Sequence, residues 1–300
     1  MPKLGFHMAI FYYSDFSRVH SSSNFGDDIN PFLLEKLLTP SLIVRDDVCV
    51  MGIGTLINDE NINALRRFAR KLIFSSGVGY GSFTSELDAS WDVICVRGPK
   101  TAETLGLEPE KAVCDGAVLL SNYFDVIPDS KRQTSVIFIP HIKTHWAAGE
   151  ELRKVAKRVG MTYLPPDLPA NDFINRVANA KLVVTEAMHG AILADTMRVP
   201  WIPVGLHEHN RFKWADWMSS IGVDYHCNSI SPSIWNSPKD TFRKFAKLPL
   251  QKIKVKLLSQ CLSDVIVKKT ASLSSDELLE NRKRQLLDKV DYMNSTYGSA

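Results

Sequence analysis

Short apolar segments rich in β-branched residues alternate with amphipathic stretches of helical length, and this alternation most constrains the fold. The expected strands are 4–12, 48–52, 71–75, 93–97 and 112–114, then 135–139, 161–163, 181–185 and 201–204. The expected helices are 30–38, 61–70, 99–105, 149–159, 170–179 and 190–197. Because strand–helix alternation is typical of βαβ units, we expect an α/β protein with mostly parallel sheets.

A polar, proline-containing segment at 126–133 interrupts the alternation, which then restarts, so we expect an interdomain linker there. Two Rossmann-like domains are expected at 1–127 and 134–238, with the active site in the cleft between them; 300 residues suit two such units. Residues 239–300 are expected to form a basic helical extension, whose last helix opens with the capping box Ser274-Ser275-Asp276-Glu277.

Composition excludes several classes of protein. Apolar residues make up 45% of the chain, enough for a core, but no apolar run approaches the ~20 residues of a membrane span. The N-terminus lacks a signal-peptide pattern, so we expect a cytoplasmic protein. A net charge of +3 gives no strong bias toward nucleic acid. The chain has five cysteines, an odd number, and no two of them are close together in the sequence. This pattern predicts buried free thiols and neither disulfides nor a zinc site.

Ligands of open α/β sheets bind beyond the carboxyl ends of the strands, so the candidate binding residues are sought there. In the first half these are Asn24, Gly26, Asp27, Asp28, Gly54, Gly77 and Arg97. Glycines let backbone approach a ligand, and a cation at a strand end suits an anion. The alternatives are a capped turn at Asn24–Pro31, tight turns at the glycines, and a surface salt bridge for Arg97.

In the second half, His141, Lys143 and His145 follow a strand and suit a clamp for phosphate or carboxylate, with a solvated loop as the alternative. Glu186 and His189 lie at a strand–helix junction, where the helix dipole favours anions and shifts pKa values. We take this pair as the candidate catalytic residues, against a purely structural histidine. Arg211 and Lys213 fall in 205–214, expected to be a loop that does not favour a metal.

Taken together and in order, these motifs resemble the polysaccharide pyruvyl transferase family. The resemblance rests on Asn24-Phe25-Gly26-Asp27-Asp28, Gly52-Ile53-Gly54-Thr55, Gly77-Val78-Gly79, Val96-Arg97-Gly98-Pro99, Asp115-Gly116-Ala117, His189-Gly190-Ala191-Ile192-Leu193-Ala194 and Lys213. Within the family, the chain looks most like the ketal-pyruvate transferases of succinoglycan-type polysaccharides. Many members carry Ser-Arg-Leu-His where this chain has Glu186-Ala187-Met188-His189, so the histidine matches and the arginine does not.

The resemblance implies a GT-B-like fold, phosphoenolpyruvate as co-substrate with no further cofactor, and a saccharide acceptor whose paired hydroxyls become a cyclic pyruvate ketal. Ketal formation needs an acid, a base and several cations, and we expect His189 and Glu186 to be the acid–base pair, without deciding which residue takes which role. We expect the anion clamp to consist of His141, Lys143, Arg211 and Lys213, with Arg97 opposite. The alternatives are a GT-B glycosyltransferase that uses a nucleotide sugar, and a binding module without catalysis.

The C-terminal extension carries the basic excess. From Lys239 to Ala300 there are 13 Lys or Arg against 7 Asp or Glu, whereas the rest of the chain is acidic by three charges. Seven cations lie within 239–256: Lys239, Arg243, Lys244, Lys247, Lys252, Lys254 and Lys256. We expect peripheral contact with the inner face of the membrane, where a lipid-linked acceptor would lie, with packing against the protein body as the alternative.

Overall fold

The structure, a computed structural model, describes residues 9–13, 24–206, 209–231 and 248–298, and the side chains of all of these except 248–252. The chain divides into two compact units. Unit 1 contains Met1–Tyr123, Asn210–Tyr225 and Ser274–Ala300, and unit 2 contains Phe124–His209 and His226–Leu273. The expected domains were contiguous ranges, whereas here two late segments of the chain pack within unit 1.

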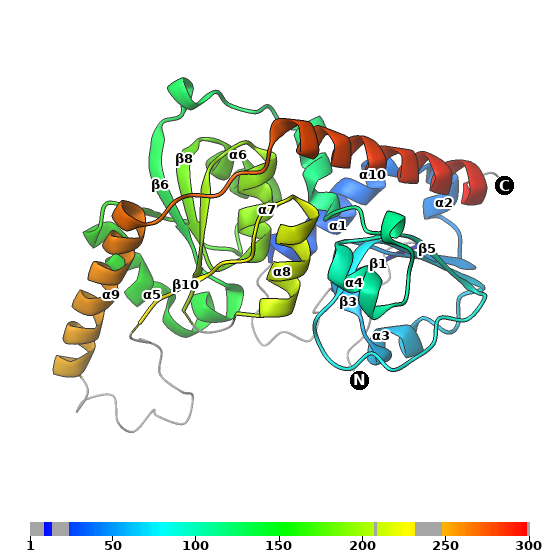
Figure 1. Ribbon diagram of the computed structural model, residues 1–300, viewed down its shortest axis with the longest axis horizontal. Coiled ribbons are helices and arrows are strands. Elements are labelled where there is room, and N and C mark those ends of the chain that lie inside the picture. Colours follow the sequence, from blue (N-terminus) through cyan, green and yellow to red (C-terminus); the bar gives the residue numbers. More distant parts are fainter. Residues whose placement is uncertain (1–8, 14–23, 207–208, 232–247, 299–300) are drawn as a thin grey trace. The chain divides into compact units, whose positions relative to one another are not determined.

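Unit 1 is built on a parallel five-stranded sheet (Figure 1). Its strands are β1 (Ile10–Phe11), β2 (Val48–Met51), β3 (Gly54–Ile57), β4 (Arg70–Val78) and β5 (Trp91–Val96). The order is β1-β2-β4-β3, and β5 also pairs with β4. Val50 and Leu72 on the central strands are fully buried, because helices cover both faces of a parallel sheet. This burial explains the near-continuous apolar runs in the sequence.

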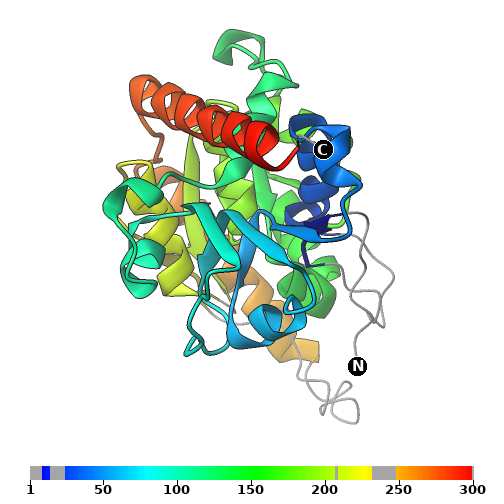
Figure 2. The same cartoon turned by 90° about the vertical axis from the view of Figure 1, so that its right-hand side faces the viewer.

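The helices of unit 1 come from all three of its segments. They are α1 (Phe25–Leu37), α2 (Pro40–Ile43), α3 (Asp59–Ala64), α4 (Pro99–Thr104), α8 (Arg211–Ser220) and α10 (Asp276–Tyr297), with 3₁₀ turns at Pro109–Lys111 and Gly116–Asn122. α10 lies beside α1 and α2 (Figure 2), where the Asn294 side chain accepts from the Thr39 N–H at 2.9 Å and donates to the Leu37 carbonyl at 2.9 Å. Ser275 caps α10 by accepting from the Leu278 N–H, so the N-cap lies one residue later than in the expected capping box of Ser274 and Glu277.

Unit 2 contains a second parallel sheet, of order β10-β9-β8-β6-β7. Its strands are β6 (Thr134–Ile139), β7 (Thr162–Tyr163), β8 (Ala180–Thr185), β9 (Trp201–Gly205) and β10 (Asn228–Ser229). The helices are α5 (Ile142–Arg158), α6 (Ala170–Ala178), α7 (Met188–Thr196) and α9 (Leu248–Lys268), with a 3₁₀ turn at Asp129–Lys131. Leu258 and Leu262 of α9 share a buried core cluster with Leu152 and Val155 of α5.

The α/β class and the parallel sheets are confirmed, but several expected local boundaries are wrong. Residues 112–114 form only an isolated bridge between Ala112 and Val96. The loop expected at 205–214 becomes α8 from Arg211 onward, because Trp214 and Trp217 are buried in unit 1. α1 begins at Phe25 and α5 at Ile142, so Gly26, Asp27, Asp28, Lys143 and His145 lie in helices.

Within the described residues, no helix combines the length and apolar character needed to cross a bilayer. Of the basic segment 239–256, residues 239–247 lie outside the described part of the chain, and the rest belongs to α9.

Cys49, Cys95 and Cys114 should react with thiol reagents only after unfolding. All three are buried free thiols, as the sequence predicted, and burial raises the pKa of Cys49 and of Cys95 to about 12. Because the thiolate is the nucleophile, these thiols are unreactive at neutral pH even to a small reagent. Labelling with iodoacetamide at pH 8, with and without denaturant, followed by peptide mapping, checks this. Modification of these cysteines in the native protein would show that strands β2 and β5 are exposed.

Candidate functional site

Glu186 ties together three loops at the carboxyl edge of the unit 2 sheet. It is 1% exposed and follows the last residue of β8. One carboxylate oxygen accepts from the N–H of His141, which lies in the loop after β6, at 3.0 Å. The other accepts from the N–H of Leu206, which follows β9, at 3.2 Å. A buried carboxylate needs such donors, and charge-assisted bonds of this kind are strong. Glu186 therefore fixes the loops that surround it.

His189 lies in the first turn of α7, at the same edge of the sheet, and is half-buried. The turn before it is fixed by Thr185, whose hydroxyl donates to the Ala187 carbonyl at 2.8 Å and accepts from the Ala187 N–H at 3.0 Å. Gly190 is required here, because a Cβ would lie 2.7 Å from that hydroxyl oxygen. The helix N-terminus places His189 in a positive field that suits a bound anion.

The start of α5 brings the other predicted residues of this half to the same edge. His141 is the N-cap of α5, and its Nδ1 accepts from the Lys143 N–H at 3.3 Å. His145 uses both ring nitrogens inside the protein, with Nδ1 2.7 Å from the Tyr163 hydroxyl and Nε2 3.3 Å from an Asp167 carboxylate oxygen. Its role is thus to hold the start of α5 on the loop after β7, and Lys143 is exposed to solvent.

Cys227 and His209 lie beside the end of β9, with Sγ and Nδ1 3.5 Å apart. Burial, with a contribution from the charge of Glu186, raises the pKa of the Cys227 thiol to about 11. The pair consequently holds a protonated thiol at neutral pH and lacks the thiolate that nucleophilic catalysis needs. Among the described residues, no group of three or more His, Cys, Asp or Glu side chains is placed to hold a metal ion.

In unit 1, Arg97 is fully buried and belongs to an internal network. Its Nε donates to Asp216 at 3.1 Å, Nη1 to the Thr55 hydroxyl at 2.8 Å, and Nη2 to the Val78 carbonyl at 3.0 Å. The Asp216 carboxylate, also fully buried, accepts in addition from the Thr101 N–H and hydroxyl. Arg97 thus joins α8 to the ends of β4 and β5. The sequence had left two interpretations of Arg97 open, a ligand for an anion and a surface salt bridge.

This network explains two of the glycines. A Cβ on Gly77 would run into the Arg97 guanidinium, and one on Gly98 would run into the Asp216 carbonyl and carboxylate. Gly77 therefore makes room for an internal arginine. Gly54 has a different reason, since its φ of 137° is a conformation that side chains disfavour.

The first turn of α8 approaches the glycine-rich loop after β4. Asn210 caps α8 by accepting from the Lys213 N–H at 3.1 Å, and its amide donates to the Gly79 carbonyl. Lys213 Nζ donates to the Tyr80 hydroxyl at 2.8 Å. Arg211 is exposed, with its guanidinium carbon 5.3 Å from the centre of the Tyr225 ring. The two predicted cations therefore flank one helix N-terminus in unit 1.

The predicted residues around Asn24 form the start of α1. The Asn24 side-chain amide donates to the Asp27 carboxylate at 2.7 Å. The backbone carbonyl of Asn24 accepts from the N–H groups of Asp27 and Asp28. Burial, together with the charges of Asp28, Glu35 and Asp27, raises the pKa of Tyr12, which follows β1. This end of unit 1 is therefore acidic.

Nine predicted residues lie in unit 1 and five in unit 2. Unit 1 holds Asn24, Gly26, Asp27, Asp28, Gly54, Gly77, Arg97, Arg211 and Lys213, and unit 2 holds His141, Lys143, His145, Glu186 and His189. Sequence reasoning missed Asn30, Thr55, Thr101, Asn210 and Asp216. Asn30 is fully buried and bonds to both the N–H and the carbonyl of Ile53. Asn210 had a usable signal, because a polar N-cap precedes a helix.

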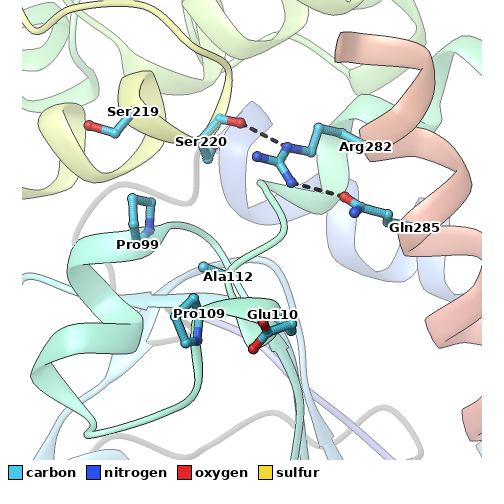
Figure 3. A pocket seen from close by; sticks show the side chains of 8 residues that line it. All are labelled: Pro99, Pro109, Glu110, Ala112, Ser219, Ser220, Arg282 and Gln285. Atoms are coloured by element: carbon cyan, nitrogen blue, oxygen red, sulfur yellow. Dashed lines mark hydrogen bonds between the residues drawn. The ribbon is translucent and has the colours of Figure 1, made fainter. Parts of the chain in front are cut away.

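A pocket of about 440 Å³ in unit 1 lies at the other end of α8 (Figure 3). None of the predicted site residues lines this pocket. Its lining residues are Pro99, Pro109, Glu110, Ala112, Ser219, Ser220, Arg282 and Gln285. Arg282 donates to the Ser220 carbonyl and to the Gln285 side chain, both at 2.9 Å. The Arg282 guanidinium in the pocket is thus engaged by the protein, and the strand ends remain the candidate site.

Comparison with known proteins identifies the family of the chain. A family model described as polysaccharide pyruvyl transferase matches residues 9–208. The succinoglycan biosynthesis protein ExoV of Rhizobium meliloti (strain 1021) is 36% identical over 219 residues, which is 70% of this chain and 65% of that protein. The match thus spans slightly less than two thirds of the relative's length.

Replacing Asp216 by Asn should destabilise the protein by about 3–5 kcal/mol, the usual cost of breaking a buried ion pair from one side. Asparagine still accepts from Thr101, but the buried Arg97 guanidinium loses its counter-charge. Urea unfolding followed by circular dichroism measures the loss.

The matched control is Asp264→Asn, which breaks an exposed pair with Lys268 on α9 and should leave the unfolding midpoint unchanged. Equal midpoints for the two variants would mean that the Arg97–Asp216 pair does not hold α8 in place.

Proposed function

Because the chain belongs to the polysaccharide pyruvyl transferase family, we propose that it transfers pyruvate from phosphoenolpyruvate to a pair of sugar hydroxyls of an exopolysaccharide repeat unit. The product is a cyclic pyruvate ketal, and inorganic phosphate is released. The observation that carries the proposal is the family match over 9–208, which includes the edge where His189, Glu186, His141 and Lys143 gather.

The finer fold assignment is part of this proposal: two Rossmann-like domains of the GT-B type. It is supported by two five-stranded sheets in which every described strand pair is parallel. In such sheets the strand carboxyl ends bind the ligand.

Ketal formation requires one proton to be added and two to be removed. Protonation of the methylene carbon of phosphoenolpyruvate turns it into a methyl group and leaves an oxocarbenium-like centre at the adjacent carbon. One sugar hydroxyl attacks that carbon and loses its proton, and the second hydroxyl then displaces phosphate. The net reaction joins the diol and phosphoenolpyruvate and releases phosphate. An acid, a base and cations for two anionic groups are therefore needed.

We assign proton transfer to His189, which is half-buried at the N-terminus of α7. Glu186 accepts two backbone N–H bonds, so its part in the pair is to position the loops and to place negative charge near the histidine turn. Lys143 and the N-terminus of α5 are suited to bind the phosphate or the carboxylate of the donor. Arg211 and Lys213 are the candidate cations from unit 1. Phosphoenolpyruvate is a co-substrate, and the proposed chemistry uses no further cofactor.

The direct test is phosphate release. The protein is incubated with phosphoenolpyruvate and a 4,6-diol pyranoside, and the sugar product is examined by mass spectrometry for the pyruvate ketal. Thermal-shift measurements with phosphoenolpyruvate and with UDP- and CMP-sugars separate this function from that of a nucleotide-sugar glycosyltransferase. Stabilisation by a nucleotide sugar and not by phosphoenolpyruvate would favour the latter.

His189→Ala should lower the rate of pyruvyl transfer by about 10²–10⁴-fold, the contribution of a general acid or base. His189→Asn keeps a polar side chain but cannot transfer a proton at neutral pH, so it should lose as much activity. Rates with saturating phosphoenolpyruvate, together with unchanged thermal unfolding, check the prediction. Recovery of activity by the Asn variant would reduce His189 to a hydrogen-bonding group.

We also propose that the enzyme is cytoplasmic and that the basic segment 239–256 holds it at an anionic membrane surface near a lipid-linked acceptor. Residues 239–247 lie outside the described residues, but Lys254 and Lys256 on α9 are exposed. Each cation near an anionic leaflet contributes about 1 kcal/mol. Co-sedimentation with phosphatidylglycerol vesicles at low salt should be lost when these lysines are neutralised; binding unaffected by neutralisation would contradict the proposal.

A further inference from the structure

Helix α9 presents an apolar pair to solvent near its N-terminal end. Ile253 and Leu257 lie one turn apart and therefore share a face of the helix, and they are 56% and 52% exposed. Leu258 and Leu262, on the opposite face, are fully buried in the core of unit 2. α9 is thus anchored through one apolar face and carries a second apolar surface that is open to solvent.

Two lysines flank the apolar pair. With 3.6 residues per turn, Lys254 and Lys256 project on either side of it, and both are exposed. Neither lysine makes an ion pair with any residue that the structure describes. The sequence just before α9 carries four more cations: Lys239, Arg243, Lys244 and Lys247. Exposed apolar side chains between lysines are the pattern of a helix that lies in the interface of a bilayer.

This apolar surface is confined to the first part of α9. Farther along the same face, the Gln260 amide donates to Asp264 at 3.0 Å, and Asp264 pairs with Lys268 at 3.2 Å. The face of the helix thus changes from apolar and basic to polar within two turns after Leu257. A surface that binds lipid would therefore be the N-terminal end of α9 and not its whole length.

α9 runs from the carboxyl edge of the unit 2 sheet to its amino edge (Figure 1). Ser272, four residues after α9, bridges to Trp201, the first residue of β9. In the middle of the helix, Cys261 Sγ donates at 3.0 Å to the carbonyl of Ser231, which lies two residues after β10. At 1.5 Å per residue, the apolar pair lies about 6–12 Å farther out, beyond the strand ends. The pair therefore lies at the edge of the sheet that holds the candidate site of unit 2.

We propose that α9 inserts Ile253 and Leu257 into the headgroup region of an anionic bilayer, so that the carboxyl edge of the unit 2 sheet faces the lipid. Lys254 and Lys256 bind lipid phosphates beside the inserted pair. A protein partner fits less well, because two aliphatic side chains fall far short of the about 800 Å² per partner that a stable interface buries. Apolar insertion and a defined orientation go beyond the proposed electrostatic contact; only the lipid-linked sugar acceptor rests on the proposed function.

Co-sedimentation of the full chain with phosphatidylglycerol vesicles, at low and at high salt, tests the insertion. The double variant Ile253→Ser, Leu257→Ser removes the apolar pair and keeps every charge. The matched control is the double variant Val44→Ser, Val267→Ser, because these valines are exposed aliphatic residues outside the pair, at 72% and 79%. Thermal unfolding verifies that the variants fold.

We expect the variant without the apolar pair to bind vesicles about tenfold more weakly at both salt concentrations, because two apolar side chains no longer enter the interface. The double variant Lys254→Gln, Lys256→Gln should bind about tenfold more weakly at low salt only, since salt screens the lysines. The valine control should equal wild type. Equal binding by the first variant and wild type would overturn the proposal, as would a wild-type dimer in sedimentation velocity that this variant loses.

Phosphate release separates this proposal from pyruvyl transfer. One acceptor is octadecyl β-D-glucopyranoside in phosphatidylglycerol vesicles, and the other is methyl β-D-glucopyranoside in solution. The variant without the apolar pair should react about tenfold more slowly with the vesicle-borne acceptor and at the wild-type rate with the soluble one. Vesicle binding that depends on the pair, without phosphate release from wild type, would retain the insertion and reject pyruvyl transfer. Phosphate release from the vesicle-borne acceptor at equal rates in this variant and wild type would do the reverse.

Discussion

The ion pair between Arg97 and Asp216 is the interaction on which unit 1 depends. The two residues are 119 positions apart in the sequence, and both are fully buried. Taking two charges out of water is costly unless each is satisfied by well-placed partners. Here Thr55, Val78 and Thr101 complete the hydrogen bonds. The pair attaches α8 to the ends of β4 and β5, and two glycines are needed to make room for it.

The consequence of this attachment lies at the N-terminus of α8. Asn210 and Lys213 reach the loop after β4 because the Arg97–Asp216 pair fixes the helix that carries them. The position of Tyr80 follows in turn, since both contacts meet its loop. A buried charge pair is weak evidence of stability, but it specifies one arrangement well, because any shift of α8 leaves a charge without its partner. We therefore regard the pair as the device that sets the local geometry at this edge.

The sequence predicted the parts of the fold that depend on local pattern. Strands β2, β4, β6, β8 and β9 appear as apolar runs because helices bury both faces of their sheets. α8 was missed because its buried residues include Asp216 as well as tryptophans, so its face carries no clean apolar period. The partner of Arg97 was missed for a related reason, since no local pattern reveals a contact over 119 positions. The strand-end rule selected residues that do lie near strand ends, but it could not show that His145 and Arg97 are engaged inside the protein.

Glu186 shapes the turn around it. A side chain as short as serine could not accept from backbone N–H groups on two neighbouring loops, whereas Glu186 does so with its two carboxylate oxygens. The next position is Ala187, held by two hydrogen bonds from Thr185, so this turn supplies no cation. Burial and then the negative charge of Glu186 raise the pKa of Cys227, and the same charge opposes a bound anion unless a cation offsets it. Lys143 lies two residues beyond His141, the N-cap of α5 whose backbone N–H donates to Glu186, and it is exposed. The Glu186 carboxylate thus fixes the backbone close to Lys143, an exposed cation that could offset its charge.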